Sequence, residues 1–187
     1  MKNKKISNGM KYIAVFCSSK EIDGKYTEPA KEFARLIVEN GYHLVFGGSD
    51  TGLMKIVAGE VKKTGGKVVG VSLKVFHHLI KKDADEMILA DNLGHRKDLM
   101  LEHADAIVAL VGGLGTLDEL VHIAELKKQE HHDKPIIVLN TDNFYEGLIH
   151  QFQKMEMDGF NAFIMDDYVR FVNTPEEAIE YINKSLK

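Results

Sequence analysis

The chain of 187 residues contains one cysteine, no tryptophan and three prolines. The single cysteine, Cys17, excludes a framework of intramolecular disulfides and is compatible with the reducing conditions of the cytoplasm. No segment approaches the roughly 18 consecutive apolar residues of a membrane-spanning helix. The basic start, Met1 to Lys5, lacks the apolar core of a signal peptide. We therefore expect a cytoplasmic protein with no membrane partner.

The net charge is also small and negative, with a formal value of −4. This value argues against a nucleic-acid-binding protein held on its target by bulk electrostatics. With 44% hydrophobic residues, the chain is long enough for one substantial core and too short for two comfortable domains. The sequence therefore predicts a single domain over residues 1–187.

Apolar runs typical of buried strands alternate with segments whose apolar residues recur at helical spacing. Such alternation with short connections predicts an α/β fold, namely a Rossmann-like parallel sheet of about seven strands with helices on both faces. The segment 72–82 has no clear pattern and is expected to be a loop with a short helix. Strands are predicted over 11–16, 42–46, 67–71, 86–89, 105–110, 135–139 and 169–172, and helices over about 30–38, 53–61, 93–103, 117–128, 144–157 and from 174 onward.

A glycine-rich turn, residues 112–116, directly follows the strand predicted over 105–110. Its three glycines would let the backbone approach an anion closely and direct unpaired helix N–H groups at it, although ordinary βα turns are also rich in glycine. Glu119, three residues after Thr116, is expected in the first helical turn. There it would either complement the helix dipole or face a ligand whose phosphate lies on the glycines.

Two further polar turns are expected at the same edge of the sheet. Ser18 and Ser19 follow the first predicted strand, and a glycine turn, residues 47–52, follows the second. Ligands of parallel α/β sheets bind at the carboxyl ends of the strands. The first turn lacks the dinucleotide-binding glycine pattern, and residues 47–52 lack the Lys-Ser/Thr ending of a triphosphate-binding loop. A monophosphate ligand and no cofactor therefore fit best.

Arg96 is expected near this edge, early in the helix predicted over 93–103. It shares a helix face with Leu93 and Met100, so it either extends its side chain to solvent or holds a phosphate or carboxylate in a bidentate fork. An ion pair with Glu119 would keep that carboxylate ionised and fix its direction. The neighbouring Lys97 is interpreted as a solvated charge rather than the Schiff-base lysine of a pyridoxal phosphate enzyme.

The remaining motifs point away from metals and toward self-association. The nine histidines include no H-E-x-x-H motif and no cysteine–histidine spacing, so no metal site is expected. Cys17 is expected to be a small buried side chain close to the site. Ile123 and Leu126 form an apolar stripe distinct from that of Leu117, Leu120 and Ala124. This second stripe predicts packing on another helix or on a second subunit, and we expect a homodimer.

Two spaced motifs together resemble the signature of the Lonely Guy family, R-K-x-x-M followed by P-G-G-x-G-T-x-x-E. The first motif is matched by Arg96, Lys97 and Met100, and the second by residues 112–116 with Glu119. The similarity extends over most of the chain and includes the turns after the first two strands. Departures from the family pattern are Val111 for a proline, Ser49 for a glycine, Gly94 for a histidine, and Leu126 and Lys128 for an aromatic residue and a glutamine.

The resemblance implies hydrolysis of a purine or cytokinin nucleoside 5′-monophosphate to free base and ribose 5-phosphate. Catalysis is assigned to Arg96 and Glu119. A nucleotide- or phosphorylated-cofactor-binding protein without catalytic activity is the alternative, and a pyridoxal phosphate decarboxylase is a weaker one. The residues expected to bind substrate are Ser18, Ser19, Gly47, Gly48, Lys97, Gly112, Gly113, Leu114, Gly115 and Thr116.

Overall fold

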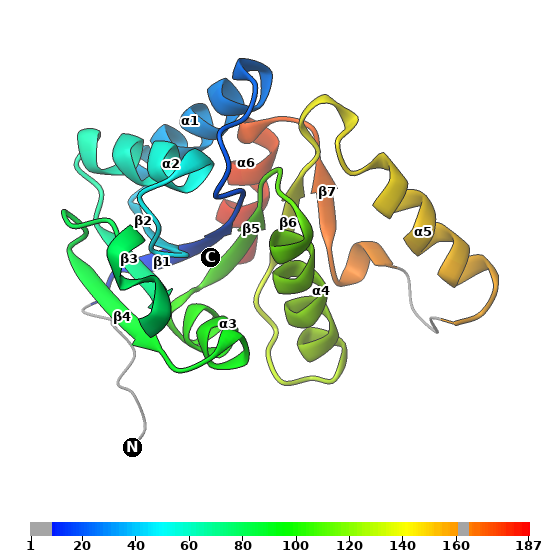
Figure 1. The fold of residues 1–187 in the computed structure, drawn as a ribbon. Coiled ribbons are helices and arrows are strands. Elements are labelled where there is room, and N and C mark those ends of the chain that lie inside the picture. The colour runs from blue at the N-terminus through cyan, green and yellow to red at the C-terminus, as the bar shows by residue number, and fades with distance from the viewer. Residues whose placement is uncertain (1–8, 161–164) are drawn as a thin grey trace.

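The computed structural model describes residues 9–160 and 165–187. They form one parallel sheet of seven strands in the order β4-β3-β2-β1-β5-β6-β7 (Figure 1). The predicted α/β class and strand number are confirmed. Among the helices of the described residues, none has the length and apolar character needed to cross a membrane.

The elements follow the predicted alternation, and most bounds agree with the prediction within a few residues. The strands are β1 (Lys11–Phe16), β2 (Tyr42–Phe46), β3 (Val68–Leu73), β4 (Glu86–Ala90), β5 (Ala106–Ala109), β6 (Ile136–Leu139) and β7 (Arg170–Val172). The helices are α1 (Gly24–Glu39), α2 (Gly52–Lys63), α3 (Leu93–His103), α4 (Leu114–Lys128), α5 (Glu146–Met157) and α6 (Pro175–Ser185), with short 3₁₀ segments η1 (Lys74–Leu79), η2 (Thr141–Asn143) and η3 (Met165–Asp167).

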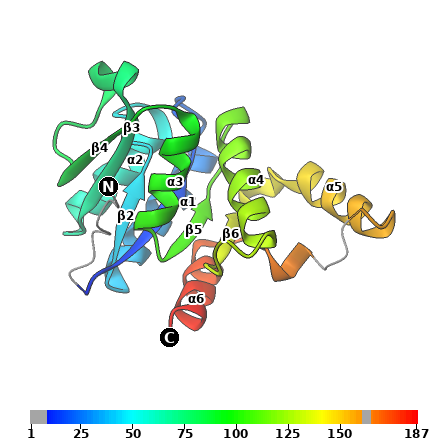
Figure 2. The ribbon, with the colours of Figure 1, turned by 90° about the horizontal axis from the view of Figure 1, so that it is seen from below.

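Buried side chains alternate between the two faces of the sheet, as strand geometry requires. In β1, Ile13 and Val15 belong to a core cluster with residues of α1, α2 and α6. Tyr12 and Ala14 belong to a second cluster with residues of α3 and α4 on the other face (Figure 2). Because both faces are covered, every residue of β1 after the first is buried.

The strand order reverses between β1 and β5. From β1 the chain moves outward through β2, β3 and β4, and β5 then pairs with the other side of β1. In open parallel sheets, the crevice outside the carboxyl ends of the strands at such a reversal is the usual ligand site. The turns after β1, β2 and β5 all lie at this edge.

Two expectations for α4 are wrong. The helix begins at Leu114, with Gly113 as its N-cap, so Glu119 lies in the second turn and does not complement the helix dipole in the first. Ile123 is fully buried in the same core cluster as Leu120, and Leu126 packs against that cluster. Since α4 turns this side toward its own sheet, Ile123 and Leu126 do not form a stripe for a second subunit.

Candidate active site

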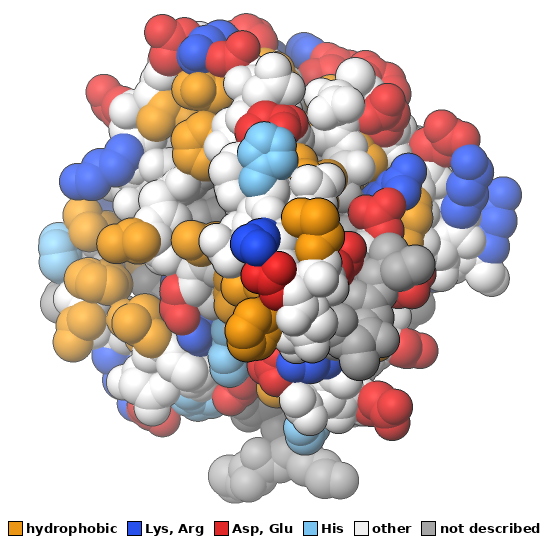
Figure 3. Space-filling view, turned by 90° about the vertical axis from the view of Figure 1, so that its right-hand side faces the viewer, with side chains coloured by type: hydrophobic (Ala, Val, Ile, Leu, Met, Phe, Trp, Pro, Cys, Tyr) orange, Lys and Arg blue, Asp and Glu red, His pale blue; other side chains and the backbone are white. Residues whose placement is uncertain are grey.

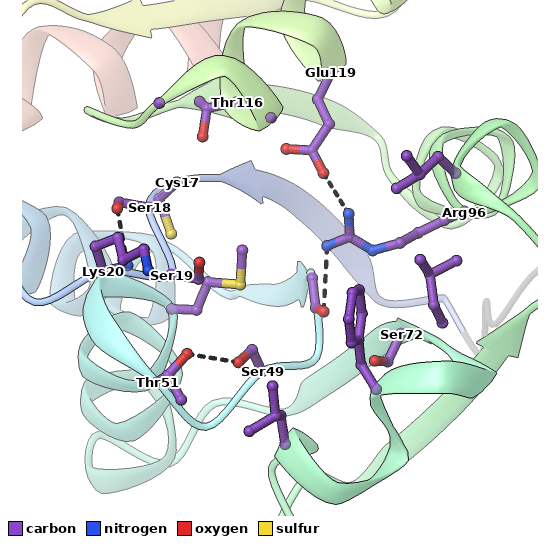
Figure 4. A pocket seen from close by; sticks show the side chains of 18 residues that line it. Cys17, Ser18, Ser19, Lys20, Ser49, Thr51, Ser72, Arg96, Thr116 and Glu119 are labelled. Carbon is purple, nitrogen blue, oxygen red and sulfur yellow. Dashed lines mark hydrogen bonds and ion pairs between the residues drawn. The ribbon is translucent and has the colours of Figure 1, made fainter.

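A cavity of about 500 Å³ lies at the carboxyl edge of the sheet. It is enclosed by the turns after β1, β2 and β5, by η1, and by the first turns of α2, α3 and α4 (Figure 4). Eight of the twelve predicted site residues line it. The lining residues are Cys17, Ser18, Ser19, Lys20, Gly47, Ser49, Thr51, Met54, Ser72, Leu73, Phe76, Leu79, Leu93, Arg96, Gly113, Gly115, Thr116 and Glu119.

The two residues assigned to catalysis meet inside this cavity. Arg96 Nη1 on α3 donates a hydrogen bond of 2.7 Å to Glu119 Oε1 on α4 (Figure 4). Both side chains are largely buried, with 13% and 7% of their surfaces exposed. In a charge-assisted pair of this length, each partner restricts the orientation of the other. The predicted contact between these two side chains is therefore present.

Backbone carbonyls hold the other donors of the guanidinium. Arg96 Nε donates to the Val71 carbonyl at 2.9 Å, and Nη2 donates to the Gly47 carbonyl at 3.3 Å. A Cβ at Gly47 would overlap the Arg96 guanidinium, so a side chain at this position would require a shift there. With a carboxylate and two carbonyls on its three nitrogens, Arg96 is a fixed support for Glu119.

The electrostatics of Glu119 differ from the sequence-based expectation. Arg96 lowers the pKa of the Glu119 carboxyl, as expected, but burial has the larger effect and raises this pKa above its ordinary value of 4.5. Desolvation disfavours the charged form of a carboxyl group. A carboxylate with a raised pKa, aimed into a cavity, is suited to accept a proton or to stabilise a positive charge.

The start of α4, where an anion seat was predicted, has the local features that such a seat needs. The first N–H groups of a helix have no partner within the helix, and they carry the positive end of its dipole. A Cβ added at Gly113 or Gly115 would meet no atom within 4 Å, so an anion has open access to the backbone here. Gly112 plays a different part, because a Cβ there would overlap the Thr116 side chain, which is itself buried.

The turn after β1 lies on the other side of the anion seat. The Ser18 backbone N–H donates to the Val111 carbonyl at 3.1 Å, which ties this turn to the one after β5. Ser18 Oγ accepts a hydrogen bond of 3.0 Å from the Lys20 backbone N–H. Ser18, Ser19 and Lys20 therefore lie side by side, across the cavity from Arg96 (Figure 4).

Four predicted substrate-binding residues are not among those that line the cavity: Gly48, Lys97, Gly112 and Leu114. The interpretation of Lys97 as a solvated charge is wrong. Its residue surface is only 8% exposed, and its ammonium group donates to both carboxylate oxygens of Asp118 at 3.0 Å. The side chain lies between α3 and α4, where a long cation is buried only with a carboxylate beside it.

Sequence reasoning missed the apolar wall of the cavity. Leu73, Phe76 and Leu79, at and within η1, line one side, and Met54 and Leu93 extend this wall. The apolar residues within segment 72–82 were the available signal for this wall. They did not predict it, because the segment has neither a helical nor a strand period. Lys20 was also missed, because an exposed lysine in a loop carries no distinctive pattern.

The prediction for Cys17 can be checked in the structure. Cys17 lines the cavity but is 2% exposed, and burial raises the pKa of its thiol, so it is the small buried residue expected. Within residues 9–160 and 165–187, no group of three His, Cys, Asp or Glu side chains is arranged to hold a metal ion.

The profile of the family described as "Possible lysine decarboxylase" matches residues 54–182. A probable cytokinin riboside 5′-monophosphate phosphoribohydrolase of Arabidopsis thaliana is 35% identical over 160 residues, which cover 84% of this chain and 80% of the relative. A cytokinin riboside 5′-monophosphate phosphoribohydrolase of Mycobacterium tuberculosis is 36% identical over 138 residues, which cover 73% of this chain and 74% of the relative.

Solved structures with the same fold include cofactor-binding proteins. The molybdenum cofactor binding protein of Rippkaea orientalis superposes with a TM-score of 0.75 at 25% identity, and the match covers 97% of this chain and 100% of that one. The molybdenum cofactor carrier protein of Chlamydomonas reinhardtii superposes with a TM-score of 0.69 at 21% identity, covering 95% and 98%. This second likeness concerns the fold alone.

Proposed function

The chain belongs to the Lonely Guy family, whose profile carries the description "Possible lysine decarboxylase", and on this premise we propose that it is a phosphoribohydrolase. Its substrate is a purine or cytokinin nucleoside 5′-monophosphate. Water replaces the base at the anomeric carbon, so that the N-glycosidic bond breaks and the products are free base and ribose 5-phosphate. The observation that carries this proposal is the buried pair of Arg96 and Glu119 beside an anion seat in one cavity.

Glu119 is the catalytic group. Cleavage of an N-glycosidic bond develops positive charge on the ribose, as in the oxocarbenium-like transition states of glycosidases. The ionised carboxylate stabilises this charge and accepts a proton from the attacking water. Because Glu119 is 5% exposed, little bulk water screens its charge, and the stabilisation is larger than at a protein surface.

Arg96 orients this carboxylate. Its bond to Glu119 Oε1 leaves the second carboxylate oxygen without that partner, and its two carbonyl bonds prevent the guanidinium from rotating. The geometry is thus set before substrate binds, which lowers the cost of reaching the transition state.

The 5′-phosphate binds at the start of α4, on the backbone of Gly113 and Gly115 and on the Thr116 side chain, with Ser18 and Ser19 opposite. We assign its charge partner to Lys20. Among the residues that line the cavity, Arg96 and Lys20 are the two cations, and the nitrogens of Arg96 are engaged. Lys20 lies beside Ser18, on the phosphate side (Figure 4).

The experiment that tests the function is a panel of nucleoside monophosphates assayed for free base and for ribose 5-phosphate. Both products should appear in equal amounts, and the matching nucleosides should not react, since they lack the phosphate that holds the ribose beneath Glu119. Products in unequal amounts, or equal rates with the nucleosides, would contradict the assignment.

A binding protein without catalysis is the second candidate, and the likeness to the Rippkaea orientalis molybdenum cofactor binding protein favours it. The same anion seat would serve such a protein. Glu119 separates the two functions, because a carboxylate near a bound phosphate repels it and is useful only if positive charge develops there. Tight binding of a nucleotide with no product over many hours would support this second candidate.

We also propose that the protein acts in the cytoplasm as a homodimer. Leu114 and Val121 are 85% and 44% exposed, and their spacing of seven residues places them on one face of α4. Exposed apolar groups of this kind are typical of protein–protein contacts. Figure 3 shows hydrophobic side chains gathered mainly on one side of the face that it draws. Light scattering of Leu114→Glu should give the monomer mass where the native chain gives twice that mass.

A further inference from the structure

Two ion pairs link α3 and α4, and they use adjacent residues on both helices. Arg96 pairs with Glu119, and Lys97 pairs with Asp118. The helices lie side by side (Figures 1 and 2). Arg96 and Glu119 line the cavity, whereas Lys97 and Asp118 are not among the residues that line it. Since a side chain at position i and its neighbour at i+1 move with the same backbone, the second pair constrains the first.

We propose that Lys97 and Asp118 are positioning residues for the reaction, which hold the Glu119 carboxylate in place through the ion pair next to it and act on it with opposite charges. This inference rests on the proposed function of Glu119. The ammonium group of Lys97 is largely buried and binds both oxygens of Asp118 at 3.0 Å. A buried ammonium that contacts both oxygens of one carboxylate is more restricted than the single contacts of exposed lysines.

The ionisable groups that interact with Glu119 come from α3, from α4 and from the end of β1. Arg96 and Lys97 on α3 lower the pKa of the Glu119 carboxyl, whereas Asp118 on α4 raises it. Cys17, at the end of β1, has a thiol pKa that is raised by burial and by Glu119 itself, so it is neutral at ordinary pH. Lys97 and Asp118 therefore act on Glu119 with opposite signs, although each is equally necessary for their ion pair.

This opposition distinguishes an electrostatic role from a purely mechanical one. Lys97→Met and Asp118→Asn both break the pair between the helices. If the ion pair served only to hold the two helices together, both variants would shift the pKa of Glu119 in the same direction. If its charges set the protonation of Glu119, Lys97→Met moves the pKa of Glu119 upward and Asp118→Asn moves it downward.

The test measures the titration of Glu119 directly by NMR of protein carrying ¹³C in its glutamate carboxyl groups. The Glu119 signal is assigned by its absence in Glu119→Gln. We expect the titration midpoint to rise in Lys97→Met and to fall in Asp118→Asn, with Lys97→Arg close to the native value. Lys62→Met, which breaks the 3.1 Å pair with Asp85 at the other edge of the sheet, is the matched control and should leave the midpoint unchanged.

Turnover of the monophosphate provides the second readout. At the pH optimum Lys97→Met should lower kcat about tenfold with little change in KM, since a small displacement of a catalytic group costs rate more than binding. Midpoints that shift in the same direction in both variants, or do not shift, would overturn the inference. Opposite shifts in a protein without hydrolytic activity would leave the electrostatic effect of the two residues on Glu119 standing, but would reject the phosphoribohydrolase assignment and with it their role in the reaction. Asp118 is half exposed, so its variant is expected to fold even if Lys97→Met does not, and a midpoint that fails to fall in Asp118→Asn would by itself overturn the inference.

Discussion

Replacement of Glu119 by glutamine is the most informative perturbation of this site. The change keeps the size of the side chain and an oxygen that accepts from Arg96, but it removes the negative charge. Native Glu119 and Arg96 are joined at 2.7 Å within a largely buried pair. Any loss of rate therefore reports the charge itself rather than a collapse of the cavity.

The size of the effect follows from the burial of Glu119. A negative charge about 4 Å from a developing positive charge stabilises it by about 4 kcal/mol at an effective dielectric constant of about 20. That energy corresponds to a loss of about 10³-fold in kcat. KM should stay equal or fall, because Glu119→Gln removes a negative charge near the phosphate and leaves the glycine seat intact.

The assay is single-turnover release of ribose 5-phosphate from a nucleoside monophosphate, with nucleotide affinity measured separately by calorimetry. Glu125→Gln is the matched control, because Glu125 lies on the same helix but is exposed and pairs with Lys128 and Gln129 at the end of this helix. A Glu119→Gln variant that turns over within a few-fold of the native rate would refute the reasoning. So would a variant that loses affinity as much as rate.

Three further predictions concern the same cavity. Burial raises the pKa of Glu119, and activity needs the ionised form of this carboxyl. Therefore kcat/KM should fall as the pH drops, and the midpoint of the pH–rate profile should lie above 4.5. A flat profile down to pH 4 would exclude Glu119 as the base. Lys20→Met should raise KM for the monophosphate about tenfold or more, since one charged contact contributes about 1.5–3 kcal/mol, whereas Lys25→Met, which removes an ion pair outside the cavity, should not change KM. Gly47→Ala should lower kcat about 10²-fold by displacing the Arg96 guanidinium, and native turnover in that variant would show that the overlap is relieved without moving it.

Much of the fold was predictable because it depends on local patterns. The strands are apolar runs and the helices have a clear period, so the parallel sheet and its carboxyl edge followed from the order of elements alone. The final helix begins where its N-terminal residues predict, with Thr174 and Glu177 forming a reciprocal capping box. The proximity of Arg96 and Glu119 was also predictable, since each follows a strand that ends at the same edge.

The remaining features depend on contacts between segments far apart in the chain. Residues 72–82 have no period, so only the tertiary structure shows that Phe76 and Leu79 form a wall of the cavity. Ile123 and Val121 are both apolar residues on one helix, and the rotation of α4 against the sheet decides that Ile123 is buried and Val121 exposed.

The amino-acid sequence by itself determined the class of fold, the edge of the sheet at which the cavity lies and the two side chains that meet there, because periodicity and turn chemistry are local properties. The tertiary structure decided how those side chains behave. Burial, which no local pattern encodes, raises the pKa of Glu119 against the effect of Arg96. Only the packing of α3 on α4 shows that Lys97, which the sequence suggested to be a solvated charge, is paired with Asp118. A lysine is buried only where the fold places a carboxylate within its reach.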